Sequence, residues 1–265
     1  MEYSVFYRNI PMQYRVSGTG KPLVLLHGYL ESIDVWNGFE GELAKDFKVI
    51  SIDLLGHGKT GNLGDIHTMK QMAEAVRFIL HLLHLKHFYL LGHSMGGYVA
   101  AQYSYDFPQE VDGLILLHSA PKADSQDKKA NRKRIIELVK NGKKAIVVAQ
   151  HTPKLFASGN IPIFAQHIER LKIIAGNTTE QGIIAALNGM MQRMNLLPFL
   201  NNSDFPVLMI VGKKDNFIPF SVAEEILHHS NGHIKSCILE NSGHVGFIEE
   251  AEKTITAIKN FINNE

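Results

Sequence analysis

The sequence predicts an α/β fold in which helices cover both faces of a mostly parallel, eight-stranded sheet. Short apolar runs alternate with segments of helical length up to residue 121, as expected when helices connect strands that are buried on both faces. The alternation stops between residues 122 and 203, where the sequence indicates helices alone. We therefore expect a core domain of residues 1–121 and 204–265, with residues 122–203 inserted as a helical cap over the edge of the sheet where such folds bind ligands.

The individual elements follow from apolar runs and turn-forming residues. Residues 3–17 indicate two strands joined by a turn at residues 9–11. Strands buried on both faces are predicted at residues 23–26, 49–52, 88–91 and 114–117, with segments of helical length at 35–45 and 68–85. After the insertion, strands are expected at 206–211 and 234–239, followed by a last helix from about residue 249.

Composition excludes several classes of protein. Lys plus Arg number 27 and Asp plus Glu number 26, so the net charge of +1 lacks the basic excess of a nucleic-acid binder. No apolar run reaches the roughly 18–20 residues that span a bilayer, and the N-terminus lacks the features of a signal peptide. The single cysteine, Cys237, fits a reducing compartment. We expect a cytoplasmic protein that acts on a small molecule; the sequence leaves its oligomeric state open.

A serine flanked by glycines lies where a predicted strand gives way to a helix. Residues 90–97, LLGHSMGG, contain the pattern G-x-S-x-G with Ser94 at its centre. In that pattern the serine occupies a sharp, strained turn that lifts its hydroxyl clear of the sheet, and Gly92 and Gly96 leave room that a side chain would fill. The pattern alone is weak, since a serine before a helix also suits a cap, but its strand-turn-helix context favours a nucleophile.

A serine nucleophile needs a base, and the base needs a group that orients it. Among the fourteen histidines, His244 follows the last predicted strand and has small neighbours that leave its imidazole room. Asp215 follows the preceding strand and, taken alone, suits a turn equally well. Ser94, Asp215 and His244 nevertheless come at three strand ends in a chain order known for such triads. We predict that Ser94 is the nucleophile, His244 the base and Asp215 the orienting carboxylate.

A site of this kind also needs amide donors for the developing oxyanion. Residues 25–29, LLHGY, end an early strand, so we expect the backbone N–H of Tyr29 to point toward Ser94. The N–H of Met95, directly after the nucleophile, is the second expected donor. His27 is then expected to shape this loop, not to act as a base.

These motifs resemble the single-domain α/β-hydrolase superfamily, in particular its esterases, enol-lactonases and carbon–carbon hydrolases. The resemblance covers nearly the whole chain through HG at 27–28, DLLGHG at 53–58, GHSMGG at 92–97, GKKD at 212–215 with Pro219, and GH at 243–244. It implies that Asp53, Gly56 and Gly58 build a structural loop, that Asp53 and His57 are not catalytic, and that the cap sets the substrate. A serine nucleophile argues against the dehalogenases and epoxide hydrolases of the superfamily, which carry aspartate there. HGY argues against the lipases with a longer glycine run.

Three methionines in the cap allow two interpretations. Met190, Met191 and Met194 either line an apolar substrate pocket together with Tyr29, or they belong to the core.

Two further clusters, one of histidines and one of basic residues, are not assigned a function. His81, His84 and His87 are spaced by three, whereas zinc sites on helices more often pair histidines four apart, so we predict no metal and no cofactor. The basic residues of the cap are interpreted as a solvated helix face because the whole chain is nearly neutral; they are Lys128, Lys129, Arg132, Lys133 and Arg134.

The residues thus predict hydrolysis of a small carboxylic ester or related acyl compound through an acyl-enzyme. Activity is expected to fall in acid, because a histidine base must be neutral. Two alternatives remain open: a carbon–carbon hydrolase or lyase that uses the same triad, and a small-molecule receptor without enzymatic activity. The sequence does not determine the natural substrate or its chain length.

Overall fold

A computed structural model describes residues 1–230 and 232–264. Within these described residues, eight strands form one sheet in the order β1-β2-β4-β3-β5-β6-β7-β8. The strand pairs β1–β2 and β2–β4 are antiparallel and all the others are parallel, which confirms the predicted α/β fold. The strands are β1 (Glu2–Tyr7), β2 (Ile10–Ser17), β3 (Lys21–Leu26), β4 (Phe47–Ile52), β5 (Phe88–His93), β6 (Val111–Leu117), β7 (Val207–Gly212) and β8 (Ile234–Leu239).

The connection between β1 and β2 is tighter than predicted. The turn consists of Arg8 and Asn9, with φ of 48° and 67°, and not of residues 9–11. Two consecutive residues with positive φ form the hairpin turn whose twist matches that of the flanking strands. Pro11 lies within β2 opposite Phe6, outside the part of β2 that pairs with β4.

Helices cover both faces of the sheet. The core helices are α1 (Phe39–Leu43), α2 (Met69–Leu82), α3 (Met95–Asp106), α9 (Phe220–His229), α10 (Gly246–Glu249) and α11 (Ala251–Asn263), with the 3₁₀ turns η1 (Ile33–Trp36) and η2 (Pro108–Glu110). The helix predicted over residues 35–45 is divided into η1 and α1 because Gly38, with φ of 92°, leaves the helical conformation between them.

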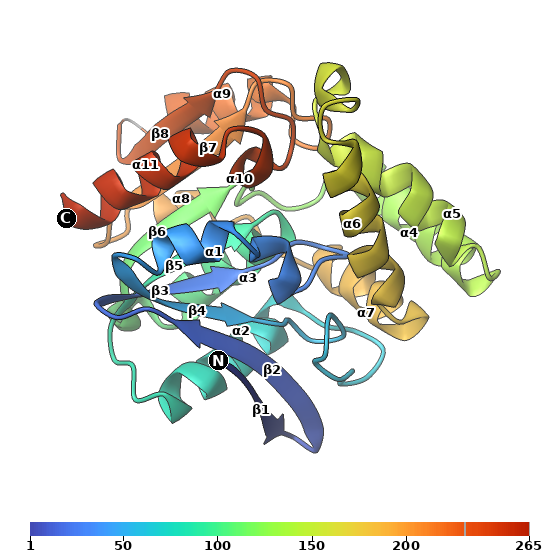
Figure 1. Cartoon of the computed structure of the whole chain (residues 1–265), viewed down its shortest axis with the longest axis horizontal. Helices are drawn as coiled ribbons and strands as arrows, with labels where there is room; N and C mark the ends of the chain where they lie inside the picture. The colour runs from blue at the N-terminus through green and yellow to red at the C-terminus, as the bar shows by residue number, and fades with distance from the viewer. Residues whose placement is uncertain (231, 265) are drawn as a thin grey trace.

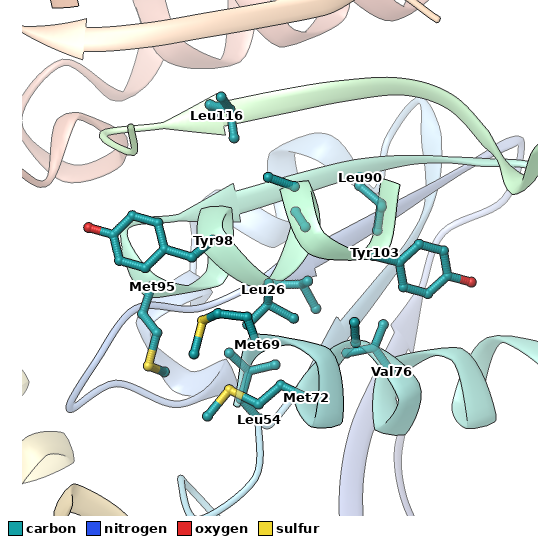
Figure 2. Packing of buried hydrophobic residues seen from close by; sticks show 14 of the residues in the cluster. Leu26, Leu54, Met69, Met72, Val76, Leu90, Met95, Tyr98, Tyr103 and Leu116 are labelled. Atoms are coloured by element: carbon teal, nitrogen blue, oxygen red, sulfur yellow. The ribbon is translucent and has the colours of Figure 1, made fainter. Parts of the chain in front are cut away.

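Alternate residues of each central strand enter two different cores. In β3, Val24 and Leu26 pack on the side of α2 and α3, whereas Leu23 and Leu25 pack on the side of α1 and α11. Figure 2 shows the first side, where Leu26 and Leu90 lie near side chains of α2 and α3. Burial on both faces explains why each central strand is continuously apolar, and it holds the strand ends rigidly.

The segment between β6 and β7 contains the inserted helices, the name used below for α4 to α8 with η3 and η4. Their bounds are α4 (Gln126–Lys140), α5 (Lys144–His151), η3 (Thr152–Leu155), η4 (Ser158–Asn160), α6 (Ala165–Asn177), α7 (Glu180–Met190) and α8 (Leu197–Leu200). Figure 1 shows α4 to α7 grouped beside the sheet, away from the β1 and β8 edges. The N–H of His244, beyond β8, donates a 2.6 Å hydrogen bond to the carbonyl of Leu155, which joins the inserted helices to the carboxyl ends of the strands. Within the described ranges, no helix has both the length and the apolar character needed to cross a membrane.

Candidate active site

Ser94 occupies a strained turn between β5 and α3. Its backbone has φ of 50° and ψ of −113°, a conformation that residues with a side chain rarely adopt. The turn is possible because glycines surround it: a Cβ on Gly92 would overlap the carbonyl oxygen of Gly96, and a Cβ on Gly96 would overlap that of Leu26. The geometry agrees with the strained turn expected from the G-x-S-x-G pattern.

The structure brings Ser94, His244 and Asp215 together in one chain of hydrogen bonds. His244 Nε2 lies 2.8 Å from Ser94 Oγ, and His244 Nδ1 lies 2.7 Å from Asp215 Oδ2. An ionised carboxylate only accepts hydrogen bonds, so Nδ1 carries the proton and Nε2 is free to accept the proton of the serine hydroxyl. The arrangement can therefore activate the hydroxyl as a nucleophile.

Asp215 is held ionised and in a fixed orientation. Its Oδ1 accepts hydrogen bonds from the backbone N–H groups of Phe217 (2.7 Å) and Ile218 (2.9 Å), as at the start of a tight turn. Burial alone would raise the pKa of Asp215, but the charge of His244 and hydrogen bonds from His118 and His244 lower it far below its usual range. A fixed negative charge stabilises the imidazolium that forms when His244 takes a proton.

His118, which sequence reasoning missed, is a second histidine on this carboxylate. Its Nε2 accepts the N–H of Gly246 (2.9 Å), so its proton lies on Nδ1, 3.3 Å from Asp215 Oδ2. Burial lowers the pKa of His118 to about 4, so the ring is neutral near pH 7. The sequence does contain a feature that could have identified His118: it directly follows β6, and the carboxyl end of β6 lies at the same edge of the sheet as those of β5, β7 and β8.

A buried ion pair connects the loops around the serine. Glu31 Oε2 accepts the N–H of Gly28 (2.6 Å) and the Nδ1–H of His93 (2.9 Å), and His93 Nε2 donates to the carbonyl of His244 (2.8 Å). Burial alone would lower the pKa of His93, but the negative charge of Glu31 raises it above its ordinary value. The pair thus ties the loop after β3, the serine turn and the His244 loop into one unit.

The two amides expected to hold an oxyanion are free. Among the described residues, the N–H groups of Tyr29 and Met95 donate no hydrogen bond to another part of the chain. Next to them, His27 Nδ1 donates to the carbonyl of Gly28 (2.8 Å) and His27 Nε2 accepts the N–H of Leu54 (3.0 Å). Both nitrogens of His27 are therefore engaged in shaping the loop, as predicted.

Residues 53–58 have structural contacts. Asp53 accepts the backbone N–H groups of Ile33 (2.7 Å) and Lys59 (2.8 Å). Gly58 has φ of 55°, and a Cβ there would overlap the carboxylate of Asp53. This closely packed turn holds the neighbouring strand ends in place.

A cavity of about 350 Å³ opens at Ser94 and His244, between the sheet and the inserted helices. Tyr29 and Met190 line it, as the sequence suggested for a pocket. Met191 and Met194 do not line this cavity: Met191 packs against the core, and Met194 is 47% exposed and borders a separate hollow. The reason is that α7 ends at Met190, so the helical spacing assumed for the three methionines stops there.

The interpretation of the basic cluster needs correction for two of its members. Lys128 and Arg132 line the cavity, because residues four apart on α4 share one helix face and this face borders the cavity. Arg132 is only 16% exposed and donates from Nε to Asp124 Oδ2 (2.6 Å). Lys133 and Arg134 point to solvent, as expected.

No metal arrangement emerges at the three spaced histidines. Their helix, α2, ends at Leu82, and His81 and His87 lie instead beside Glu110 (3.4 Å) and Asp112 (3.6 Å). Within the part of the chain that the structure describes, the group of ligand-type side chains close enough to share an ion is His118, Asp215 and His244. Both nitrogens of His244, Asp215 Oδ2 and His118 Nε2 already take part in hydrogen bonds, and His118 Nδ1 lies 3.3 Å from Asp215 Oδ2.

Comparison with known proteins agrees with this geometry. The family model described as the alpha/beta hydrolase fold matches residues 21–251, so the chain belongs to this family. An uncharacterized protein of Mycobacterium tuberculosis is 39% identical over 104 residues, which are 39% of this chain and only 30% of that protein.

Other relatives match over nearly their whole length. The AB hydrolase superfamily protein YisY of Bacillus subtilis is 29% identical over 93% of each chain. A pimeloyl-[acyl-carrier protein] methyl ester esterase of Aeromonas hydrophila is 26% identical over 92% of this chain and 96% of its own.

Solved structures share the architecture closely. A thermophilic esterase from Thermogutta terrifontis, with malate bound, superposes with a TM-score of 0.93 at 26% identity and covers 100% of this chain and 98% of its own. The enol-lactonase from Burkholderia xenovorans has a TM-score of 0.90 over 98% and 100% of the two chains, but its 17% identity shows a common fold alone.

Proposed function

We propose that the protein hydrolyses small carboxylic esters or related acyl compounds through a covalent acyl-enzyme on Ser94. The observation that carries the proposal is the hydrogen-bond chain from Asp215 through His244 to the Ser94 hydroxyl, which ends at the floor of a cavity. Nucleophile, base and orienting acid in this relation are the requirement for acyl transfer by serine.

The proposed reaction has two halves, acylation of Ser94 and release of the acyl group, and His244 transfers the protons in both. His244 Nε2 takes the Ser94 proton while Oγ attacks the substrate carbonyl, and the free N–H groups of Tyr29 and Met95 donate hydrogen bonds to the carbonyl oxygen as negative charge develops on it. His244 then protonates the departing alcohol. In the second half, His244 activates water, which releases the acid and restores the serine.

Two further observations support an ester as the substrate. The relatives include a methyl ester esterase and an esterase, each 26% identical to this chain. The cavity of about 350 Å³ lies at the small end of the usual range for ligand pockets, so we propose a short substrate. The inserted helices supply much of its wall, and we therefore propose residues 122–203 as a cap domain that selects the substrate.

The test is turnover of p-nitrophenyl acetate and butyrate by the wild type and by Ser94→Ala. We expect a fall of at least about 10³-fold in kcat for the variant, since the oxyanion donors and binding alone leave only residual catalysis. Ser236→Ala, which changes an exposed serine of β8, serves as the matched control and is expected to retain full activity. Equal activity in Ser94→Ala would overturn the assignment.

A fluorophosphonate probe separates the proposal from its alternatives. Labelling of Ser94 together with ester turnover supports ester hydrolysis. Labelling of Ser94 with every simple ester left intact would favour a carbon–carbon hydrolase or lyase. Ligand binding without any turnover would favour a receptor.

A further inference from the structure

The cavity at Ser94 is lined by more positively than negatively charged side chains. Lys128 and Arg132 of α4 and Lys154 of η3 line the cavity. Among its lining residues the one carboxylate is Glu31, and that group is neutralised by His93 at 2.9 Å. A cavity for a purely neutral ester would not need this charge, and it is costly to bury a charged group such as Arg132, whose side chain is only 16% exposed.

The charge of Arg132 is only partly balanced. Asp124 accepts from Arg132 Nε (2.6 Å) and Nη2 (3.3 Å), but the same carboxylate also pairs with Arg193 Nη1 at 2.6 Å. One negative and two positive groups leave one positive charge in excess. Arg132 Nη1 has no hydrogen-bond partner among the described residues, so the guanidinium keeps a free donor beside the cavity.

An unsatisfied hydroxyl lies in the same cavity. Tyr29 is 9% exposed, lines the cavity, and its hydroxyl is buried without a hydrogen-bond partner. Burial raises the pKa of Tyr29, whereas the positive charge of Arg132 lowers it, which places the two groups within electrostatic reach of each other. A buried donor that lacks a partner is costly, and an acceptor on a ligand would satisfy it.

From these observations we infer that the substrate carries a carboxylate close to its ester bond, and that Arg132, Lys128 and Tyr29 bind this carboxylate. The inference rests on the proposed ester hydrolysis at Ser94. A guanidinium nitrogen, an ammonium group and a phenol hydroxyl can all donate hydrogen bonds, so together they match a carboxylate. A neutral alkyl group would offer these donors no acceptor. The cavity volume restricts the substrate to a small one, such as the half-ester of a short dicarboxylic acid or the ester of a small hydroxy acid.

The experiment compares anionic esters with neutral counterparts. Monoethyl glutarate carries the carboxylate on the acyl side and O-butyryl glycolate carries it on the alcohol side; diethyl glutarate and ethyl butyrate are the neutral partners. We expect kcat/KM to be at least tenfold higher for one of the anionic esters than for its partner, and the preferred ester identifies the side that bears the charge. Neutral esters hydrolysed as well as both anionic ones would overturn the inference.

Variants connect the preference to the named residues. Arg132→Met is expected to reduce the anionic-to-neutral ratio of kcat/KM at least tenfold, and Lys128→Met about threefold. Asp124 keeps its partner Arg193 in the first variant, so the fold is expected to persist, as a thermal melt will show. Lys133→Met removes a charge from the exposed face of the same helix and is expected to keep the ratio of the wild type.

A binding measurement separates this inference from the proposed function. Glutarate binding to Ser94→Ala, followed by calorimetry, requires no turnover and is expected to weaken at least tenfold when Arg132→Met is added. If Ser94→Ala hydrolyses esters as fast as the wild type, the proposed function is wrong, whatever the affinity for glutarate. If activity depends on Ser94 but glutarate binds equally well with and without Arg132, the carboxylate site alone fails.

Discussion

Replacing Asp215 by asparagine changes the chemistry of the hydrogen-bond chain from residue 215 through His244 to Ser94 without changing its shape. The two backbone N–H groups of Phe217 and Ile218 hold the amide oxygen at the Oδ1 position, so the NH₂ group must take the place of Oδ2. That group donates to His244 Nδ1, where the carboxylate accepted at 2.7 Å. The proton of His244 then moves to Nε2, which faces Ser94 and is no longer able to accept the hydroxyl proton.

The expected loss follows from this change of tautomer. A comparable replacement in a serine protease triad reduces kcat by about 10⁴-fold, which corresponds to about 5 kcal/mol in the barrier. The structure adds a second unfavourable contact. His118 Nδ1, which carries a proton, lies 3.3 Å from Asp215 Oδ2, so in the variant its N–H would face the NH₂ group, one donor against another. We therefore expect Asp215→Asn to lose at least about 10⁴-fold in kcat.

The assay is the initial rate of p-nitrophenyl butyrate hydrolysis, with a thermal melt to show that the variant is folded. Asp204→Asn, at an exposed position just before β7, is the matched control and is expected to behave as the wild type. A folded Asp215→Asn variant that retains more than a tenth of the wild-type kcat would refute the tautomer argument.

Two further predictions concern stability. Gly96→Ala is expected to cost about 3 kcal/mol in the free energy of unfolding and to abolish activity, because its Cβ overlaps the carbonyl oxygen of Leu26. Burial lowers the pKa of His57 to about 3 and those of His118 and His151 to about 4, so the folded chain stays unprotonated at these sites where the unfolded chain binds protons. Stability is therefore expected to fall from about pH 6.5 toward pH 4, by up to about 1.4 kcal/mol per pH unit for each histidine.

Urea unfolding checks both predictions. Gly176→Ala in α6 is the control for the glycine variant: no atom lies within 4 Å of the added Cβ, so it is expected to stabilise the helix by about 0.5–1 kcal/mol. A Gly96→Ala protein as stable as the wild type would show that the turn has room. For the histidines, an unfolding midpoint that is the same at pH 7 and pH 5 would contradict neutral burial, and His118→Gln is expected to make the pH dependence shallower.

Much of the fold follows from short-range patterns in the sequence. Continuous apolar runs mark strands such as β5 because both faces of the strand are buried, and that requirement acts on each residue separately. The need for Gly92 at the Ser94 turn is equally local, since a Cβ there would overlap the carbonyl oxygen of Gly96, whereas Gly96 is needed because the carbonyl of Leu26 lies against it. Boundaries depend on packing instead: the hairpin turn shifted to Arg8 and Asn9, and Gly38 divided a predicted helix.

The sequence by itself determined the class of fold and predicted the three residues that the structure joins by hydrogen bonds, because parallel strands bring their carboxyl ends to one edge. Only the tertiary structure decided what surrounds them. His118 reaches Asp215, and Glu31 reaches His93, through contacts between loops that are remote in the chain. Arg132 faces the cavity because of how α4 packs against α5 and α7, and charge counts over the whole chain carry no information about that orientation.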